Sequence, residues 1–310
     1  MKALAGFIVS GRWQAVLVTA ANGVLSFLLP PFSSILSYLA AAAVALVTLQ
    51  VGALSGLQVL LLAAILTVVF YQLAGVHAAV VLATVTLLWL PSWLLGLILR
   101  QTRDLGATLK AAALFGVCLL AMLYGAFGDP APWWVERLQE LQHMLKESRI
   151  AIPGLADTQL LQEAAALMTG VMLASLVLGV ISSLFLARWW QSVLMRPGAF
   201  REEFYSLRLG YGAGLVTLGT MLVARLTQGA LSEFAAQAAM IMLAPYLLAG
   251  LAVIHSLIRQ HGRGVGWLVA VYIILAFVPQ AMLLLAGGGL LDTWIDFRRR
   301  LGRSGNSTEQ

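Results

Sequence analysis

Long apolar runs separated by short polar breaks make up most of the chain. From Trp13 to Leu99 no Asp, Glu, Lys or Arg occurs. A transmembrane helix needs roughly 20 mostly apolar residues, so this stretch alone is long enough for about four of them. The pattern predicts an all-α fold, namely a polytopic transmembrane helix bundle.

Turn-forming residues and charges divide the chain into about nine apolar segments, of which we expect about eight or nine to cross the membrane. Pro91 and Pro279 each fall inside a segment. Because proline lacks the N–H that a helix interior uses, we expect both helices to bend there. The segments lie at about 13–29, 33–48, 54–73, 76–99, 109–127, 159–187, 208–226, 234–258 and 265–291.

A polar insert at about 129–157 interrupts this series. Within it Trp134, Leu138, Leu141 and Leu145 recur at helical spacing, with charged residues between them. This periodicity predicts an amphipathic helix outside the membrane core, lying either in the membrane surface or over the mouth of the bundle. We expect residues 1–303 to form a single transmembrane domain and 304–310 to be a disordered tail.

Composition strengthens the membrane prediction. Of the 310 residues, 61% are apolar and 10% are charged, whereas soluble domains have about 45–50% apolar and about 25% charged residues. The net charge of +6 comes from residues at segment ends, so the lipid bilayer explains it and nucleic acid is not a predicted partner. With Cys118 as the single cysteine, no internal disulfide is expected, and no cofactor is predicted.

Lysines and arginines in short loops predict the orientation, because they favour the cytoplasmic side. Lys2 and Arg12 place the N-terminus in the cytoplasm, and we expect a multi-pass protein of the bacterial inner membrane. Nine spans would then leave the arginines at 298–300 outside, against the rule. Either one apolar segment is re-entrant, or the last segment breaks at Pro279 into a hairpin.

Few side chains in the apolar segments have catalytic chemistry. The patterns H-E-x-x-H and G-x-S-x-G and the Walker loop do not occur, so we expect no enzyme. The candidate solute-lining residues are the polar groups within or next to the first apolar segments. A loop position for the histidine and interhelical hydrogen bonding for the asparagine are the alternatives. These residues are Asn22, Tyr71, Gln72 and His77.

Small residues recur every fourth position in two segments. Such stripes let helix backbones approach closely in lipid. They indicate either packing within the bundle or a docking face for another membrane subunit. The candidates are Ala15, Thr19 and Gly23 in one segment and Ser175, Gly179 and Ser183 in the other.

The end of the chain concentrates acids and arginines. If residues 292–300 continue as a helix, Asp292 and Asp296 lie one turn apart, and Asp296 can pair with Arg300. One interpretation is an ordinary membrane anchor. The other is specific docking of Asp292, Asp296, Arg298 and Arg300 on the bundle's cytoplasmic loops or on a partner, with Glu202 and Glu203 as candidate acceptors.

The C-terminal third resembles a known family. The run 248–255, which ends at His255, is followed one segment later by Gly289 to Arg298. Together with the turn at 49–52, these residues are similar to the YybS-like family of uncharacterised bacterial polytopic membrane proteins. The polar insert at 129–163 does not match. The family is distantly similar to the S components of energy-coupling-factor transporters, which implies a helix bundle that binds a small solute and docks on a membrane partner.

Two function classes follow. The first is a transporter-like protein that binds a small solute, or the membrane subunit of an uptake system. The alternative is a non-transporting scaffold that recruits a cytoplasmic protein through residues 188–208 and the tail 292–303. An outward cavity would favour the first class, and a tightly packed bundle would favour the second. An intramembrane enzyme ranks third.

Overall fold

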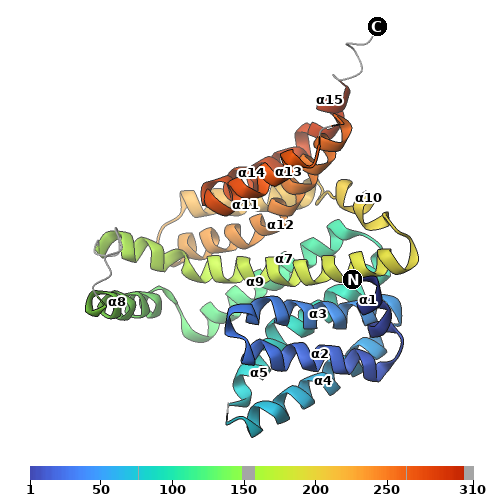
Figure 1. The fold of residues 1–310 in the computed structure, drawn as a ribbon. Coiled ribbons are helices and arrows are strands. Elements are labelled where there is room, and N and C mark those ends of the chain that lie inside the picture. The colour runs from blue at the N-terminus through green and yellow to red at the C-terminus, as the bar shows by residue number, and fades with distance from the viewer. Residues whose placement is uncertain (76, 149–157, 263, 304–310) are drawn as a thin grey trace.

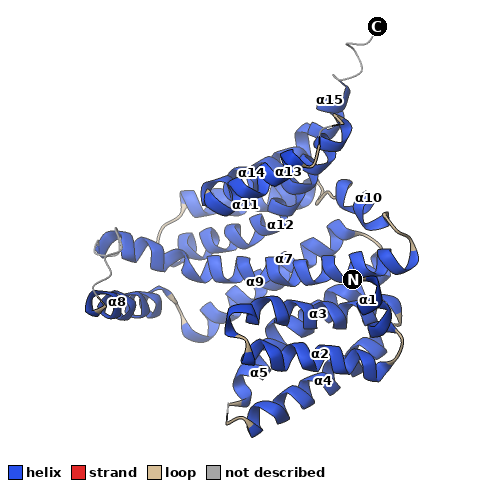
Figure 2. Ribbon diagram, in the orientation of Figure 1, coloured by secondary structure: helices blue, strands red, loops and turns tan. Residues whose placement is uncertain are grey.

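The computed structural model of the chain describes residues 1–75, 77–148, 158–262 and 264–303. This part of the chain is helical and contains no strand (Figure 2). The prediction of an all-α polytopic bundle is therefore confirmed. The predicted tail at 304–310 and the end of the polar insert lie outside the described residues.

The first half of the chain forms a compact group of helices. Prolines interrupt the helical chain here, since Pro30–Phe32 forms a short 3₁₀ helix between two α-helices. A π-helical stretch, Val85–Trp89, joins the two parts of one long helix ahead of Pro91. The helices are α1 (Lys2–Val9), α2 (Arg12–Leu28), α3 (Ser33–Gln50), α4 (Ala53–Leu73), α5 (Ala78–Thr84), α6 (Leu90–Thr102) and α7 (Leu105–Phe127).

The second half contains both the longest helix and several short ones. These are α8 (Ala131–Glu147), α9 (Thr158–Met195), α10 (Ala199–Tyr205), α11 (Tyr211–Leu226), α12 (Ala230–Gln260), α13 (Gly266–Phe277), α14 (Pro279–Ile295) and α15 (Phe297–Arg303). In Figure 1, α7 and α9 lie between the group α2–α5 and the group α11–α14. At 38 residues, α9 is about 57 Å long, which exceeds a bilayer core of about 30 Å.

Fewer helices than predicted are long enough to cross a membrane. Among the residues that the structure describes, six helices pass by length and composition, or up to seven if the bent pair α13–α14 is counted as one span. The expectation of about eight or nine is too high because α2 has 17 residues and α11 has 16. At about 1.5 Å per residue, such helices are shorter than a hydrocarbon core of about 30 Å.

Helix α3 lies at the centre of the first group. Every residue from Ala40 to Leu46 is fully buried, because α3 contacts α2, α4, α6 and α9. A helix that is apolar on all sides is expected in such a position. Its alanines allow these neighbours to approach closely.

The last apolar segment is broken at Pro279. Helices α13 and α14 are bent by 119°, and Pro279 is the first residue of α14. The predicted break at Pro279 is therefore observed. Helix α14 packs closely on α12, since a Cβ added to Gly250 would lie 2.2 Å from the Leu285 carbonyl oxygen. As a result, the C-terminus returns to the end of the bundle that carries α10.

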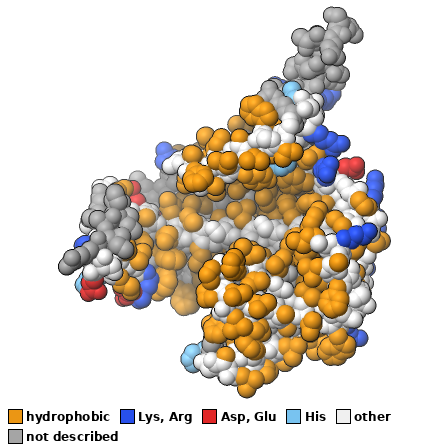
Figure 3. Space-filling view, viewed as in Figure 1, with side chains coloured by type: hydrophobic (Ala, Val, Ile, Leu, Met, Phe, Trp, Pro, Cys, Tyr) orange, Lys and Arg blue, Asp and Glu red, His pale blue; other side chains and the backbone are white. Residues whose placement is uncertain are grey.

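Charges gather at the two ends of the bundle. Figure 3 shows apolar side chains across the middle of one face, Lys and Arg at the end with α10, and charges of both signs near α8. Helix α8 forms within the predicted amphipathic insert. It is tied to α9 by the Trp134 Nε1–H, which donates to Thr169 Oγ1 at 2.8 Å. The end with α10 is called the basic end below.

Candidate functional site at the basic end

The predicted solute-lining residues lie on α2, on α4 and at the start of α5. The Asn22 amide donates to the Val18 carbonyl at 2.8 Å. The buried Tyr71 hydroxyl donates to the Gly23 carbonyl at 3.3 Å, which joins α2 to α4. Gln72 and His77 are exposed, and none of the four lines a cavity described below. Neighbouring backbone thus satisfies the two interior residues, and their grouping as an outward solute site stays a prediction.

The small-residue stripes serve packing within the chain. Ala15 and Thr19 are 1% and 0% exposed, and a Cβ on Gly23 would lie 3.0 Å from the Thr67 hydroxyl. A Cβ on Gly179 would lie 2.6 Å from the Tyr38 ring.

Ser183, also buried, donates to the Gly179 carbonyl at 3.0 Å. Ser175 alone in these stripes is exposed. Apart from Ser175, helices of the same chain cover the stripes, which fits the first alternative, packing within the bundle; the docking face for another subunit stays a prediction.

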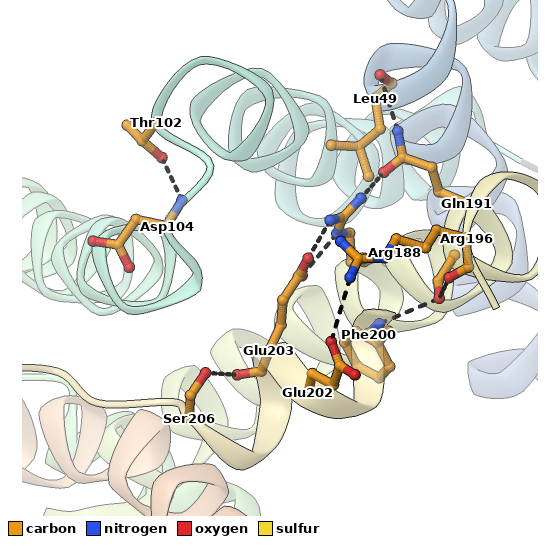
Figure 4. A network of polar contacts seen from close by, with 11 residues as sticks. Leu49, Thr102, Asp104, Arg188, Gln191, Arg196, Phe200, Glu202, Glu203 and Ser206 are labelled. Atoms are coloured by element: carbon orange, nitrogen blue, oxygen red, sulfur yellow. Dashed lines mark hydrogen bonds and ion pairs between the residues drawn. The ribbon is translucent and has the colours of Figure 1, made fainter. Parts of the chain in front are cut away.

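A polar recess of about 430 Å³ opens at the basic end. It lies where α3 and α6 end and where α9 approaches α10 (Figure 4). We call it the arginine recess. Its polar lining residues are Gln50, Arg100, Arg103, Arg188, Gln191 and Glu203.

A tight turn between α9 and α10 places Glu203 at the recess. Gly198 has a φ of 93°, in the left-handed region that favours glycine. The Ser192 hydroxyl donates to the Arg196 carbonyl at 2.9 Å and accepts from the Phe200 N–H at 3.2 Å. The turn therefore folds α10 back along α9, as Figure 4 shows.

Arg188 is held on three sides. Its Nε–H donates to Glu203 Oε2 at 2.9 Å, and its terminal nitrogens bond Glu203 Oε1 and Gln191 Oε1. The Gln191 amide in turn donates to the Leu49 carbonyl at 3.3 Å. A two-point arginine–carboxylate pair is among the stronger polar contacts in proteins. It fixes α10 to α9 and α3 and neutralises Arg188.

The other two arginines of the recess lack a carboxylate partner. Arg100 donates to the carbonyls of Thr48 and Leu49 at 3.1 and 2.9 Å, at the end of α3, where a positive charge suits the helix dipole. Arg103 makes no ion pair with any residue that the structure describes. Three arginines against Glu203 leave an excess of two positive charges around the recess.

Arg103 also has an unusual backbone. It ends α6 with φ 54°, a left-handed conformation that costs a non-glycine residue about 1–2 kcal/mol. Its side chain lines the arginine recess and a neighbouring recess of about 330 Å³. An unpaired guanidinium thus lies at the junction of the two.

The C-terminal segment is locked onto the α10–α11 connection. Arg298, 8% exposed, donates to the carbonyls of Tyr205 and Leu207, both at 2.8 Å. It also pairs with buried Asp292, with an N–O distance of 3.6 Å. Docking on a bundle loop was one interpretation of this segment, and Arg298 makes such a contact, whereas the Asp292 carboxylate contacts Arg298 and the Phe297 N–H of its own segment.

The predicted partners of this segment differ from those observed. Helix α14 ends at Asp296, which has φ 52°, so Asp296 is turned away from Arg300 and bonds Arg208 at 2.6 Å. The expectation of a continuous helix with an Asp296–Arg300 pair is wrong. This hydrogen bond from Arg208 holds the pKa of Asp296 below its usual range.

Glu202 and Glu203 are not acceptors for the tail. Glu202 lies 3.9 Å from Arg196, and Glu203 pairs with Arg188. The turn at Gly198 directs both acids toward α9, so arginines close in sequence reach them first. Arg100 and Arg103 were not among the predicted site residues, and Arg188 entered only as the start of the segment 188–208. Their position at successive ends on one membrane side is the signal that could have identified the recess.

An aromatic pocket of about 650 Å³ lies on the other side of α10. Phe185 contacts Phe200 edge-on, with ring centroids 5.5 Å apart, and His255 lies against Tyr272 at 5.9 Å. The pocket places apolar rings beside the polar recess at the same end.

Comparisons with protein-family models, curated proteins and solved structures give no match. Membership of the YybS-like family therefore stays a prediction. The case for function rests on the geometry of the basic end.

Proposed function

We propose that this chain binds a small anionic solute in the arginine recess, as a transporter-like protein or as the membrane subunit of an uptake system. The six or seven long apolar helices within the described part of the chain make it a multi-pass integral membrane protein. The observation that carries the proposal is the pair of arginines, Arg100 and Arg103, that faces the recess without a carboxylate partner.

The chemistry of the recess suits a phosphate or carboxylate. A guanidinium offers parallel N–H groups that match two oxygens of such an anion. The guanidinium N–H groups of Arg103 make no hydrogen bond to any described residue, and Gln50 and Gln191 line the same recess. The volume of about 430 Å³ lies within the range of small-molecule sites, about 300–1,000 Å³.

The proposed sidedness follows from the same residues. We place the N-terminus and the basic end in the cytoplasm, within a bacterial inner membrane. The break at Pro279 supports this, because it brings Arg298 to the end that carries Arg188 and Arg208. A single cysteine at Glu147 on α8, in a Cys118→Ala background, should then be labelled from outside intact spheroplasts. Labelling only after lysis would reverse the orientation.

Thermal unfolding of purified protein in detergent tests the binding proposal. Phosphate and citrate are titrated against chloride at matched ionic strength. A ligand at about a hundred times its Kd stabilises a protein by about 2.7 kcal/mol, so the melting temperature should rise for the parent. Arg103→Gln should abolish that rise.

Arg201→Gln is the matched control. Arg201 is also exposed and near the basic end, but it lines the aromatic pocket and not the arginine recess. It should keep the full response to the anion. Equal responses from parent, Arg103→Gln and Arg201→Gln would reduce the effect to general screening and reject the proposal. An acidic protein captured in place of a small anion would favour the scaffold function.

A further inference from the structure

A second cavity, of about 410 Å³, lies between α7, α11 and α12, away from the arginine recess. We call it the side groove. Its wall on α12 consists of Phe234, Ala238, Met242 and Tyr246, which lie one turn apart on one helix face. At about 1.5 Å per residue this row is about 18 Å long. Half the thickness of a bilayer core is about 15 Å, so the row is about as long as one leaflet is thick.

The far end of the groove is closed by aromatic contact. Phe234 packs edge-on against Tyr124, with ring centroids 5.3 Å apart. Tyr124 lies near the end of α7, whereas Lys110 lies near its start. Helices α7 and α12 therefore run in opposite directions along the groove, and Lys110 and Tyr246 lie toward the basic end.

Polar groups are confined to that basic end of the groove. Lys110 is exposed and forms no ion pair with any described residue. The Tyr246 side chain is 1% exposed, and its hydroxyl has no hydrogen bond of good geometry within the described part of the chain. The nearby Thr217 hydroxyl donates to the Ala213 carbonyl at 2.9 Å, so toward Tyr246 its oxygen can only accept. Tyr246 borders this cavity, and a phosphate there would be a stronger, charged acceptor for its hydroxyl.

We propose that the side groove binds one acyl chain of an anionic phospholipid, whose phosphate is held by Lys110 with Tyr246 as a second donor. The apolar walls and one-leaflet length fit a lipid chain better than a soluble molecule. A lysine at the end of the groove where the lipid headgroup would lie supplies a positive charge for its phosphate. This site shares no residue with the arginine recess, so either proposal can fail without the other.

Native mass spectrometry of the full chain tests the assignment. The detergent-purified protein is offered phosphatidylglycerol or phosphatidylethanolamine with the same acyl chains. The parent should retain one phosphatidylglycerol more tightly than the zwitterionic lipid. Lys110→Gln should lose roughly tenfold or more in affinity for phosphatidylglycerol, because a charged hydrogen bond is removed. Lys146→Gln on α8 should retain it like the parent.

A variant that fills the side groove tests the acyl-chain site separately from the phosphate contact. Gly212 of α11 lines the groove, and a Cβ there would meet no atom within 4 Å, so Gly212→Leu should enter the groove without disturbing the fold. It should displace the retained lipid.

Gly125→Leu on α7 is the matched control, since Gly125 is equally open and does not line the groove. Equal retention of both lipids by the parent, or full retention by Gly212→Leu, would overturn the proposal. If the parent retains both lipids equally and Gly212→Leu loses both, the groove binds an acyl chain without recognising the headgroup. That result would also contradict the role of Lys110.

Discussion

Two regions of the molecule are similarly apolar but differ in how their surfaces are used. In α3 every residue from Ala40 to Leu46 is fully buried, whereas α13 has no buried residue. The same contrast holds within the first group. The span Ala53–Leu73 is as apolar as Pro30–Gln50, yet 28% of its most apolar window is buried, compared with 56%.

Side-chain size, more than hydropathy, accounts for this difference. Alanines in α3 let four helices pack around it, whereas the larger side chains of α13, such as Ile273, are half exposed. In lipid, exposed apolar surface is not penalised, and close packing supplies the attraction between helices. The large core cluster therefore includes α3, while a small separate cluster joins α11, α12 and α14. In this C-terminal group, α11 to α15, polar contacts add to the close packing of α12 and α14.

The largest expected effect is at the polar lock of the C-terminal group. Arg298→Gln leaves Asp292, which is 3% exposed, without its counter-charge. It also removes charged donors from two backbone carbonyls. Breaking a buried pair from one side costs about 3–5 kcal/mol, and unfolding in detergent should show a loss of that order. Arg300 is exposed, so Arg300→Gln should change the free energy of unfolding by less than about 0.5 kcal/mol. Equal stability of the two variants would mean that the C-terminal group needs no polar lock.

A matched pair of substitutions tests the packing contrast directly. Ala43→Leu adds volume to a fully buried site in α3 and should lower the free energy of unfolding by about 1–3 kcal/mol. Ala270→Leu makes the same change on exposed α13 and should have little effect. Thermal unfolding of both in detergent measures the difference. A larger loss from Ala270→Leu would show that α13 is covered by something outside this chain.

The sequence was sufficient for the fold class and for the position of most helices. Runs without charge, such as Trp13 to Leu99, can only be accommodated in lipid or a core. The number of spans was less certain, since a 17-residue helix such as α2 and a segment with an internal proline can each cross, lie or turn back. Whether such a helix crosses, lies in the surface or turns back depends on the helices that pack against it, and the hydropathy of the sequence does not identify them.

The site was harder to predict because it is assembled from separated helix ends. Arg103 and Glu203 come from α6 and α10, and their proximity depends on the turn at Gly198. Docking of the C-terminal segment was foreseeable from its charge. The identity of its partners was not, because the left-handed backbone at Asp296 redirects that side chain from Arg300 to Arg208.

The smallest expected effect is a dependence of stability on pH. It distinguishes the Asp296–Arg208 pair from the Arg298 contacts, the two polar attachments of the C-terminal group. Arg208 lowers the pKa of Asp296 by its hydrogen bond, so this pair stabilises the folded state above the unfolded-state pKa of about 3.9. That contribution is lost as the pH falls through the folded-state pKa. Because Asp296 and Arg208 are 30% and 48% exposed, solvent screening limits it to about 0–1 kcal/mol. Asp296→Asn should therefore be slightly less stable than the parent at pH 7, and the gap should close toward pH 3, as measured by unfolding at each pH. A gap that widens in acid would mean that Asp296 destabilises the fold, and Arg298 would then be the main polar attachment of this group.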